Sequence, residues 1–199
     1  MYCFLTKLED RNNNKVQILK LLNYCLLGAL LLVGCQNKKE IRPPNVIFIL
    51  TDDQGYGDLG VYGAEDFSTP YLDAMASEGA RFTSYYATQP VCSASRASIL
   101  TGCYSDRLGI FNAYNPNSKK GLDPNETTIA EMLKERGYAT AIFGKWHLGD
   151  APPFLPRKHG FDKFYGILYS NDMWPKHPQQ GTVHNFPDIF LYENETPIK

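Results

Sequence analysis

The chain has 199 residues, of which 43% are hydrophobic and 13% aromatic, enough for one globular core of ordinary size. Its formal net charge is −1, and no long run of one charge sign occurs, so the charge distribution does not favour nucleic acid as a partner. Recognition of an anion would therefore have to come from a few local side chains.

The first 35 residues are typical of the leader of an exported lipoprotein. Lys15 and Lys20 precede an apolar run over residues 21–34, which is too short to span a bilayer comfortably and suits the core of a signal peptide. The run ends in LVGC, which resembles a bacterial lipoprotein processing box. The resemblance implies a lipid on Cys35, a membrane anchor, and a location in the periplasm or outer membrane. A plain secretory signal or a short anchor remains the alternative.

Two of the five cysteines remain as disulfide candidates after leader removal and lipidation, namely Cys92 and Cys103. If residues 95–101 are helical, a rise of about 1.5 Å per residue separates the two cysteines by about 15 Å. A disulfide spans only about 4.4–6.8 Å between Cα atoms. We therefore expect both thiols to stay free, while the other three cysteines leave with the leader or carry the lipid: Cys3, Cys25 and Cys35.

A polar tether over residues 36–44 leads to the folded part, residues 45–199. Residues 46–50, VIFIL, are the continuous apolar pattern of a strand that is covered on both faces in a parallel sheet. Thr69 and Pro70 then predict the start of a helix, with Gly79 as its end and residues 80–86 as the next strand; the expected apolar face of this helix is Leu72, Met75 and Ala76.

A second helix and strand are equally clear. Thr128 and Glu131 predict a capping box, Gly137 predicts the end of that helix, and residues 138–143 predict a strand. Strands that alternate with helices indicate an α/β fold, with a mostly parallel sheet flanked by helices. The later part is rich in proline and loops, with an edge strand expected over 188–192 and a turn over 193–195.

Ligands of such sheets bind beyond the carboxyl ends of the strands, where two groups of polar residues are expected. Asp52 and Asp53 follow the first strand and offer oxygen ligands to a hard divalent cation. Cys92 stands at the start of a predicted helix, where backbone N–H groups suit an anion. Positive donors come from three further residues: Arg96, Lys145 and His147. Each signal has an ordinary structural explanation alone, but together they suit a small oxyanion ester.

Four motifs carry a family resemblance: PNVIFILTDDQGYGDLGVYG, TPYLDAMASEGARFTSYY, CSASRASILTG and GYATAIFGKWHLG. In this order and spacing they resemble the N-terminal half of the type I sulfatases, the formylglycine-dependent arylsulfatase family of the alkaline-phosphatase-like superfamily. The resemblance covers roughly residues 44–175 and implies hydrolysis of sulfate esters. The exported setting favours a sulfated carbohydrate as substrate.

The resemblance implies a modification at Cys92. In the family, the cysteine of a CxPxR or CxAxR signature is oxidised to formylglycine by a maturation enzyme, and Cys92, Ala94 and Arg96 match the second form. Ala94 replaces the commoner proline, and Cys103 stands where the family usually has a basic residue, which puts one supporting contact in doubt. An aldehyde hydrate offers one hydroxyl for attack and a second that expels the product, which a thiolate cannot do.

The resemblance also assigns roles to the other candidates. It implies that Asp52 and Asp53, together with the formylglycine oxygen derived from Cys92, bind calcium. Arg96 would orient the hydrate, Lys145 would bind sulfate, and His147 would take the proton from the second hydroxyl.

Calcium takes six to eight oxygen ligands, whereas one carboxylate pair is evident in this chain. The resemblance implies that further ligands and a leaving-group acid come from a later segment, so we expect the chain to be the N-terminal part of a longer enzyme. Two alternatives remain: a phosphoester or phosphonate hydrolase of the same superfamily, and a non-catalytic surface lipoprotein that binds sulfated glycans.

Overall fold

The structure is a computed structural model that describes residues 15–24, 42–116, 118–178 and 185–198. The chain divides into two units, Met1–Leu50 and Thr51–Lys199. The predicted lipidation site at Cys35, the leader cysteines Cys3 and Cys25, and most of the predicted tether lie outside the described residues.

The described part of the first unit contains a helix over residues 15–24, all of them exposed. No described helix is long and apolar enough to cross a membrane. The strand predicted over residues 46–50 is wrong for this structure: the segment has no regular secondary structure and all five side chains are exposed, up to 85% for Ile47. A strand needs a neighbour for its backbone N–H and C=O groups, and no described strand pairs with this segment.

The second unit contains a four-stranded sheet in the order β1-β2-β3-β4. Strand β1 (Ala141–Lys145) pairs in parallel with β2 (Lys163–Ile167), and β3 (Leu191–Glu193) and β4 (Thr196–Ile198) continue antiparallel. The α/β expectation is therefore confirmed, but the described sheet is small and mixed rather than mostly parallel.

Of the other three strand predictions, two overlap strands of the structure and one is wrong. The strand expected over 138–143 is β1, which begins three residues later, and the one expected over 188–192 is β3, which also begins three residues later and is followed by a turn at 194–195. Residues 80–86 form no strand and are exposed, which corrects that prediction. Strand β2 was not predicted at all.

The helices begin where their sequence signals predict, but the helix expected to end at Gly137 stops at Lys134, and Leu72 and Met75 of the other helix's expected apolar face are exposed. Helix α2 (Pro70–Glu78) has Thr69 as N-cap and Gly79 as C-cap, and α3 (Cys92–Thr101) begins at the cysteine of the third motif. Helix α4 (Ile129–Lys134) has the predicted capping box, in which the Thr128 hydroxyl accepts from Glu131 N and the Glu131 carboxylate accepts from Thr128 N. The described residues of this unit also form four short 3-10 helices: η2 (Tyr56–Asp58), η3 (Gly60–Tyr62), η4 (Pro152–Phe154) and η5 (Pro156–His159).

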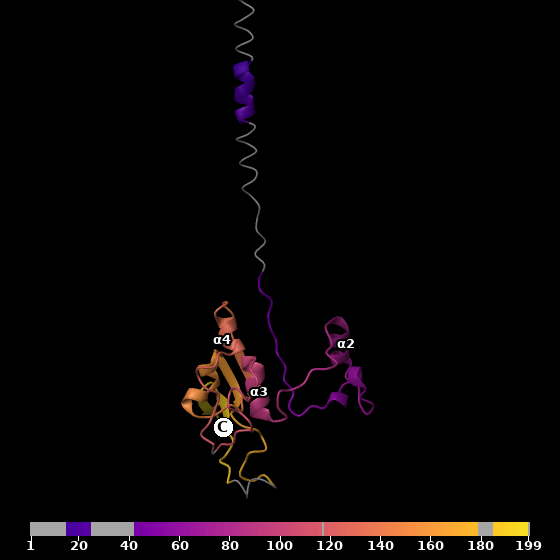
Figure 1. Ribbon diagram of the computed structural model, residues 1–199, viewed down its shortest axis with the longest axis vertical. Coiled ribbons are helices and arrows are strands. Elements are labelled where there is room, and N and C mark those ends of the chain that lie inside the picture. Colours follow the sequence, from indigo (N-terminus) through magenta and orange to yellow (C-terminus); the bar gives the residue numbers. More distant parts are fainter. Residues whose placement is uncertain (1–14, 25–41, 117, 179–184, 199) are drawn as a thin grey trace, which may run out of the picture. The chain divides into compact units, whose positions relative to one another are not determined.

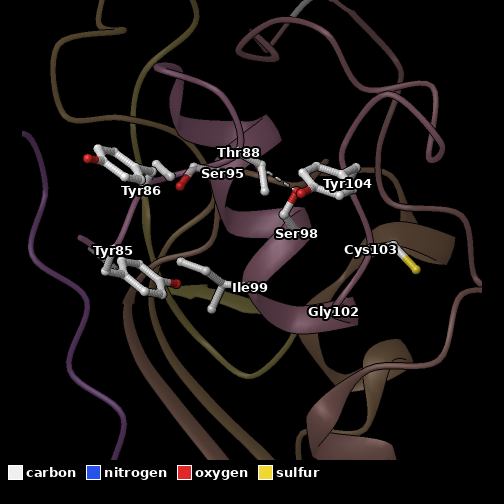
Figure 2. A pocket seen from close by; sticks show the side chains of 10 residues that line it. Tyr85, Tyr86, Thr88, Ser95, Ser98, Ile99, Gly102, Cys103 and Tyr104 are labelled. Atoms are coloured by element: carbon white, nitrogen blue, oxygen red, sulfur yellow. Dashed lines mark hydrogen bonds between the residues drawn. The ribbon is translucent and has the colours of Figure 1, made fainter. Parts of the chain in front are cut away.

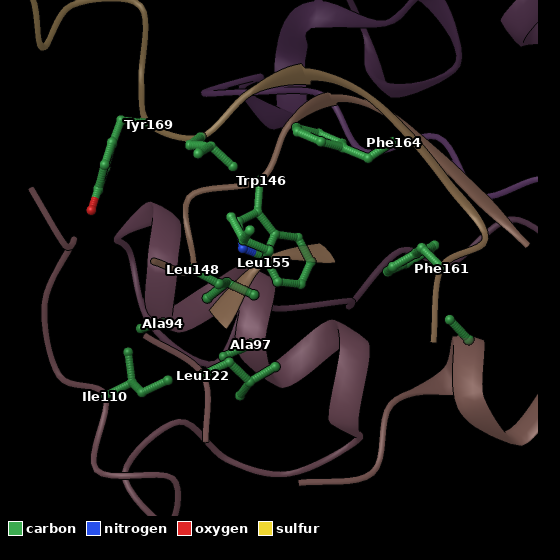
Figure 3. Packing of buried hydrophobic residues seen from close by; sticks show 12 residues of the cluster. Ala94, Ala97, Ile110, Leu122, Trp146, Leu148, Leu155, Phe161, Phe164 and Tyr169 are labelled. Atoms are coloured by element: carbon green, nitrogen blue, oxygen red, sulfur yellow. The ribbon is translucent and has the colours of Figure 1, made fainter. Parts of the chain in front are cut away.

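The core joins α3, α4 and the first two strands, which lie beside one another in Figure 1. Figure 3 shows Trp146 at its centre, where the side chain is 1% exposed and its ring meets Phe161 edge-on at a centroid distance of 6.2 Å. The indole N–H donates to the Phe154 carbonyl at 2.9 Å. Ala94 and Ala97 of α3 are fully buried against this cluster, so the helix that begins at Cys92 packs directly on the core.

Close packing of the two parallel strands also fixes the end of β1. Gly166 is the register partner of Gly144, and a Cβ at Gly166 would overlap the carbonyl group of Gly144. Glycine is therefore required for this approach. With Trp146 anchored in the core, the chain around Lys145 and His147 is held in place at the carboxyl end of β1.

Candidate functional site

The predicted cluster assembles at the carboxyl end of β1 and the N-terminus of α3. Side-chain ligand atoms of Asp52, Asp53 and Cys92 all lie within 4.8 Å of one another. Cys92 is the first residue of a ten-residue helix whose N-cap, Val91, offers no side-chain cap. The backbone N–H groups of the first helical turn therefore have no capping side chain at the end where Cys92 stands.

Lys145 connects the carboxylate and the thiol. Its Nζ donates to Asp52 Oδ2 at 2.8 Å, to Cys92 Sγ at 3.4 Å and to Ser170 Oγ at 3.1 Å. The Lys145 side chain is only 10% exposed, so its charge acts where water screens it poorly. The three contacts use all three donors of the ammonium group and fix its position.

Arg96 lies one turn further along α3 and contacts the same cluster. One guanidinium nitrogen, Nη1, donates to the Lys145 carbonyl at 2.6 Å, and Nη2 donates to Asp52 Oδ1 at 3.1 Å. Both oxygens of Asp52 thus meet a cation. Burial opposes ionisation of this carboxyl, but hydrogen bonds from Lys145 and Arg96 hold the pKa of Asp52 below its ordinary value. The carboxylate is the form present at neutral pH.

The contacts of Arg96 differ from the expected contact with the group derived from Cys92. Its described contacts go to Asp52 and to the backbone of Lys145 rather than to Cys92. Its third nitrogen, Nε, is buried without a partner among the described residues. Arg96 therefore positions the groups that surround Cys92.

His147 lies fully buried next to this cluster, with 0% exposure and a backbone φ of 61°. Its Nε2 lies 2.7 Å from the Tyr114 carbonyl oxygen, which can only accept, so Nε2 carries the proton and Nδ1 keeps a free lone pair. Nδ1 is buried without a partner among the described residues. Burial lowers the pKa of His147 to about 4, against a smaller opposing effect of the Tyr114 hydrogen bond. A neutral imidazole with an available lone pair is a proton acceptor at neutral pH.

This pKa predicts acid sensitivity of the fold. An unfolded His147 binds a proton below about pH 6.5, whereas the folded one does so only near pH 4, so stability should be lost as pH falls through this interval. The loss should be on the order of 3 kcal/mol. Chemical denaturation at pH 7 and at pH 4.5 checks it: the His147→Gln variant should lose less stability on acidification than the wild-type protein, while His177→Gln should lose as much as the wild type. An identical acid loss in both variants would contradict the prediction.

The contacts that two serines make in the site were not predicted from the sequence. Ser170 follows β2 just as Lys145 ends β1, is 7% exposed, and accepts from Lys145 Nζ. Ser93 donates to the His147 carbonyl at 2.7 Å and accepts from Tyr114 N at 2.9 Å, which links α3 to the His147 backbone. Recognition of β2 as a strand would have placed Ser170 at the same sheet end as Lys145.

The donor set fits a hard divalent cation in part. Asp52 and Asp53 supply carboxylate oxygens, which calcium prefers, while a thiol is a soft ligand that suits zinc or copper better. An oxygen group in place of the Cys92 sulfur would make the cluster uniformly hard. The cluster of Asp52, Asp53 and Cys92 then offers a minority of the six to eight oxygens that calcium takes.

A separate cavity lies on another face of α3 (Figure 2). Its volume is about 460 Å³, and its lining includes Ser95, Ser98 and Ile99 of α3 together with three tyrosines: Tyr85, Tyr86 and Tyr104. Thr88 donates to Ser98 Oγ across it at 2.7 Å. Cys103 is also among its lining residues. None of the other lining residues was a candidate for the site in the sequence analysis. Both cysteines among the described residues, Cys92 and Cys103, are free, and of these two only Cys92 faces the charged cluster.

Comparison with known proteins identifies relatives of this chain. A protein-family model described as Sulfatase matches residues 44–195. Mouse arylsulfatase G is 51% identical over 136 residues, which are 68% of this chain and 26% of the relative. Rat N-acetylgalactosamine-6-sulfatase is 46% identical over 149 residues, 71% of this chain and 28% of the relative. The chain thus spans between a quarter and a third of the length of these curated relatives.

A solved structure agrees with the sequence relatives. The crystal structure of Ps i-CgsB in complex with k-i-k-neocarrahexaose superimposes with a TM-score of 0.63 and 33% sequence identity. The match covers 74% of this chain and 35% of that chain.

Proposed function

This chain belongs to the sulfatase family, and from that premise we propose that it supplies the N-terminal part of a catalytic domain that hydrolyses sulfate esters. The observation that carries the proposal is the position of Lys145, whose ammonium group joins Asp52 to Cys92 at the start of α3. A buried cation beside a helix N-terminus and a modifiable nucleophile suits the transfer of an anionic group.

We propose that Cys92 acts as formylglycine. The conversion removes the sulfur and oxidises the side-chain carbon, so it requires a maturation enzyme that supplies an oxidant. The hydrate of such an aldehyde supplies one hydroxyl as nucleophile and a second whose deprotonation restores the aldehyde and releases sulfate. Cys92 is half-buried at the first position of α3 rather than fully enclosed in the core, which leaves it accessible to the substrate.

The other side chains bind and orient in this proposal. Lys145 holds a sulfate oxygen by charge and hydrogen bonding, and Ser170 fixes the direction of its ammonium group. Nδ1 of His147 accepts the proton that leaves the second hydroxyl, because its lone pair is free at neutral pH. Asp52 and Asp53 would hold calcium, which neutralises charge on the transferring group when bound.

The substrate class that we favour is a sulfated carbohydrate. One relative is named N-acetylgalactosamine-6-sulfatase, and the solved structure of Ps i-CgsB is a complex with k-i-k-neocarrahexaose. The predicted export signal would place the protein outside the cytoplasm, where polysaccharides occur.

The test is performed on an enzyme of the length of the curated relatives that contains this chain, co-expressed with a maturation enzyme. It should release sulfate from an aryl sulfate with a dependence on calcium, and release far less phosphate from the matched aryl phosphate. The peptide containing Cys92 should weigh about 18 Da less than its thiol form. An active enzyme with an unmodified thiol, or a preference for the phosphate ester, would refute the proposal.

Membrane attachment through Cys35 is a separate proposal. Because LVGC follows an apolar run, a lipid on Cys35 would anchor the protein in the periplasm or outer membrane. The Cys35→Ala variant should leave the membrane fraction or remain unprocessed. Wild-type fractionation and gel mobility in this variant would contradict the lipid anchor.

A further inference from the structure

A cavity of about 640 Å³ opens beyond the carboxyl end of β2. Its walls come from the end of β2, the loop that follows, and strands β3 and β4 with the segment that precedes them. The lining residues are mainly apolar, with an aromatic ring and two polar side chains among them: Ile167, Asn171, Trp174, Pro175, Asp188, Ile189, Phe190, Leu191 and Ile198. A cavity with apolar walls and a few polar groups is the usual form of a ligand site.

Two wall residues tie this cavity to the sulfate-binding lysine. Ile167 is the register partner of Lys145 in the parallel pair, so the two side chains project from the same face of the sheet. Asn171 follows Ser170, which accepts from Lys145 Nζ at 3.1 Å. A turn in which Met173 N donates to Ser170 O at 3.0 Å then brings the chain to Trp174. The cavity therefore begins within one residue of the groups that hold Lys145.

We propose that this cavity is the subsite for the sugar ring that carries the sulfate, an inference that rests on the proposed function. Trp174 is 38% exposed at the cavity wall, and the C–H face of a sugar ring can stack on the electron-rich face of an indole. Asn171 can donate to and accept from ring hydroxyls, and Asp188 can accept from them. A sulfate held by Lys145 would lie beside this space, because Ile167 and Asn171 adjoin Lys145 and its partner Ser170.

The charge of the lining narrows the sugar class further. None of the nine described lining residues is lysine, arginine or histidine, and the only charged one is Asp188. A second sulfate or a carboxylate on the bound ring would meet Asp188 without a compensating cation, and like charges at close range are strongly unfavourable. The subsite therefore selects a neutral ring with a single sulfate, and Asp188 excludes rings that carry further negative charge.

The experiment compares kinetics of the longer enzyme on two substrates: a monosulfated neutral hexose and a small aryl sulfate. In Trp174→Ala, KM for the hexose sulfate should rise roughly tenfold more than KM for the aryl sulfate, and Trp174→Phe should restore most of the difference. The matched control is Tyr71→Ala, which removes an exposed aromatic ring on α2 outside the cavity. Equal changes for the two substrates, or no change, would overturn the subsite.

The proposed role of the Asp188 charge is tested with substrates that differ in negative charge. The wild-type enzyme should prefer the monosulfated hexose over its disulfated form by roughly tenfold in kcat/KM, and Asp188→Asn should remove most of this preference. A preference that persists in Asp188→Asn would overturn the role of Asp188.

Binding separates failure of the subsite from failure of the proposed function. Calorimetry with the hexose sulfate is performed in the Cys92→Ala background, which cannot turn over the substrate. Loss of affinity on adding Trp174→Ala supports the subsite even if the wild-type enzyme hydrolyses no sulfate ester. Unchanged affinity in the double variant overturns it even if hydrolysis is observed.

Discussion

Replacement of Cys92 by alanine should lower sulfate ester turnover by about 10⁴-fold or more, because it removes the only side chain that can become the proposed nucleophile. The proposal gives its three neighbours the roles of binding the metal ion and the sulfate, which do not replace a nucleophile: Asp52, Asp53 and Lys145. The measurement is kcat/KM on an aryl sulfate in enzyme matured in parallel with the wild type.

Folding should survive the same substitution. Cys92 is half-buried at the first position of α3, where alanine is a good helix former, and the core contacts of the helix come from Ala94 and Ala97. A small side chain lost from such a position costs about 1 kcal/mol or less. Unfolding by denaturant should therefore give nearly the wild-type midpoint.

The second free thiol provides the control. Cys103 is also half-buried, lies beyond the end of α3, and lines the cavity of Figure 2 rather than the charged cluster. Cys103→Ala should keep full activity and should leave the mass of the Cys92 peptide unchanged. Equal losses in both variants would show that thiol content or stability, and not a nucleophile at Cys92, limits turnover.

Local signals predicted the helices well because those signals act within a few residues. The capping box of Thr128 and Glu131 is closed by two hydrogen bonds between neighbouring residues, and Pro70 needs only its own fixed φ to start α2. Such features form wherever the chain is placed. The starts of these helices were therefore readable from the sequence, whereas the end of α4 at Lys134 was not.

Strands depend on partners that the local sequence does not specify. The apolar run at residues 46–50 has the composition of a buried strand, yet its side chains are exposed because no described strand pairs with it. Strand β2 shows the reverse: it contains Gly166 and two exposed residues, and it forms because Gly166 permits close approach to Gly144. Pairing, rather than propensity, determined both outcomes.

The clustering of the polar residues was predicted better than the sheet. Asp52 and Lys145 were both expected at strand ends, and they meet at 2.8 Å although 93 residues separate them. The contact between Ser170 and Lys145 was not foreseen because β2 was missed. The contacts of Arg96 with Asp52 and with the Lys145 carbonyl were not foreseen either. A motif assigns a residue to a site without stating which partner that residue contacts.

Removal of the Lys145 charge should have the second largest effect. In Lys145→Met, kcat/KM on a sulfate ester should fall by about 10²–10³-fold, the usual consequence of losing one preorganised donor to a charged transferring group. The side chain is 10% exposed and makes three polar contacts, so no water or neighbouring lysine can take its place at the same point. Lys145→Arg should not restore the activity, because a planar guanidinium cannot reproduce the three contacts of a compact ammonium group.

Stability separates this catalytic effect from a structural one. Asp52 is 44% exposed and keeps its contact with Arg96, so loss of the Lys145 ion pair should cost about 1 kcal/mol or less. Lys163→Met removes a lysine from the opposite, exposed end of the parallel strand pair and should leave both activity and stability near wild type. A loss of activity in Lys145→Met that is matched by an equally large loss of stability would mean that the lysine holds β1 to α3 and not the sulfate. Selective loss of turnover, with the Cys92 peptide still about 18 Da lighter than the thiol form, would place Lys145 on the substrate rather than on the maturation step.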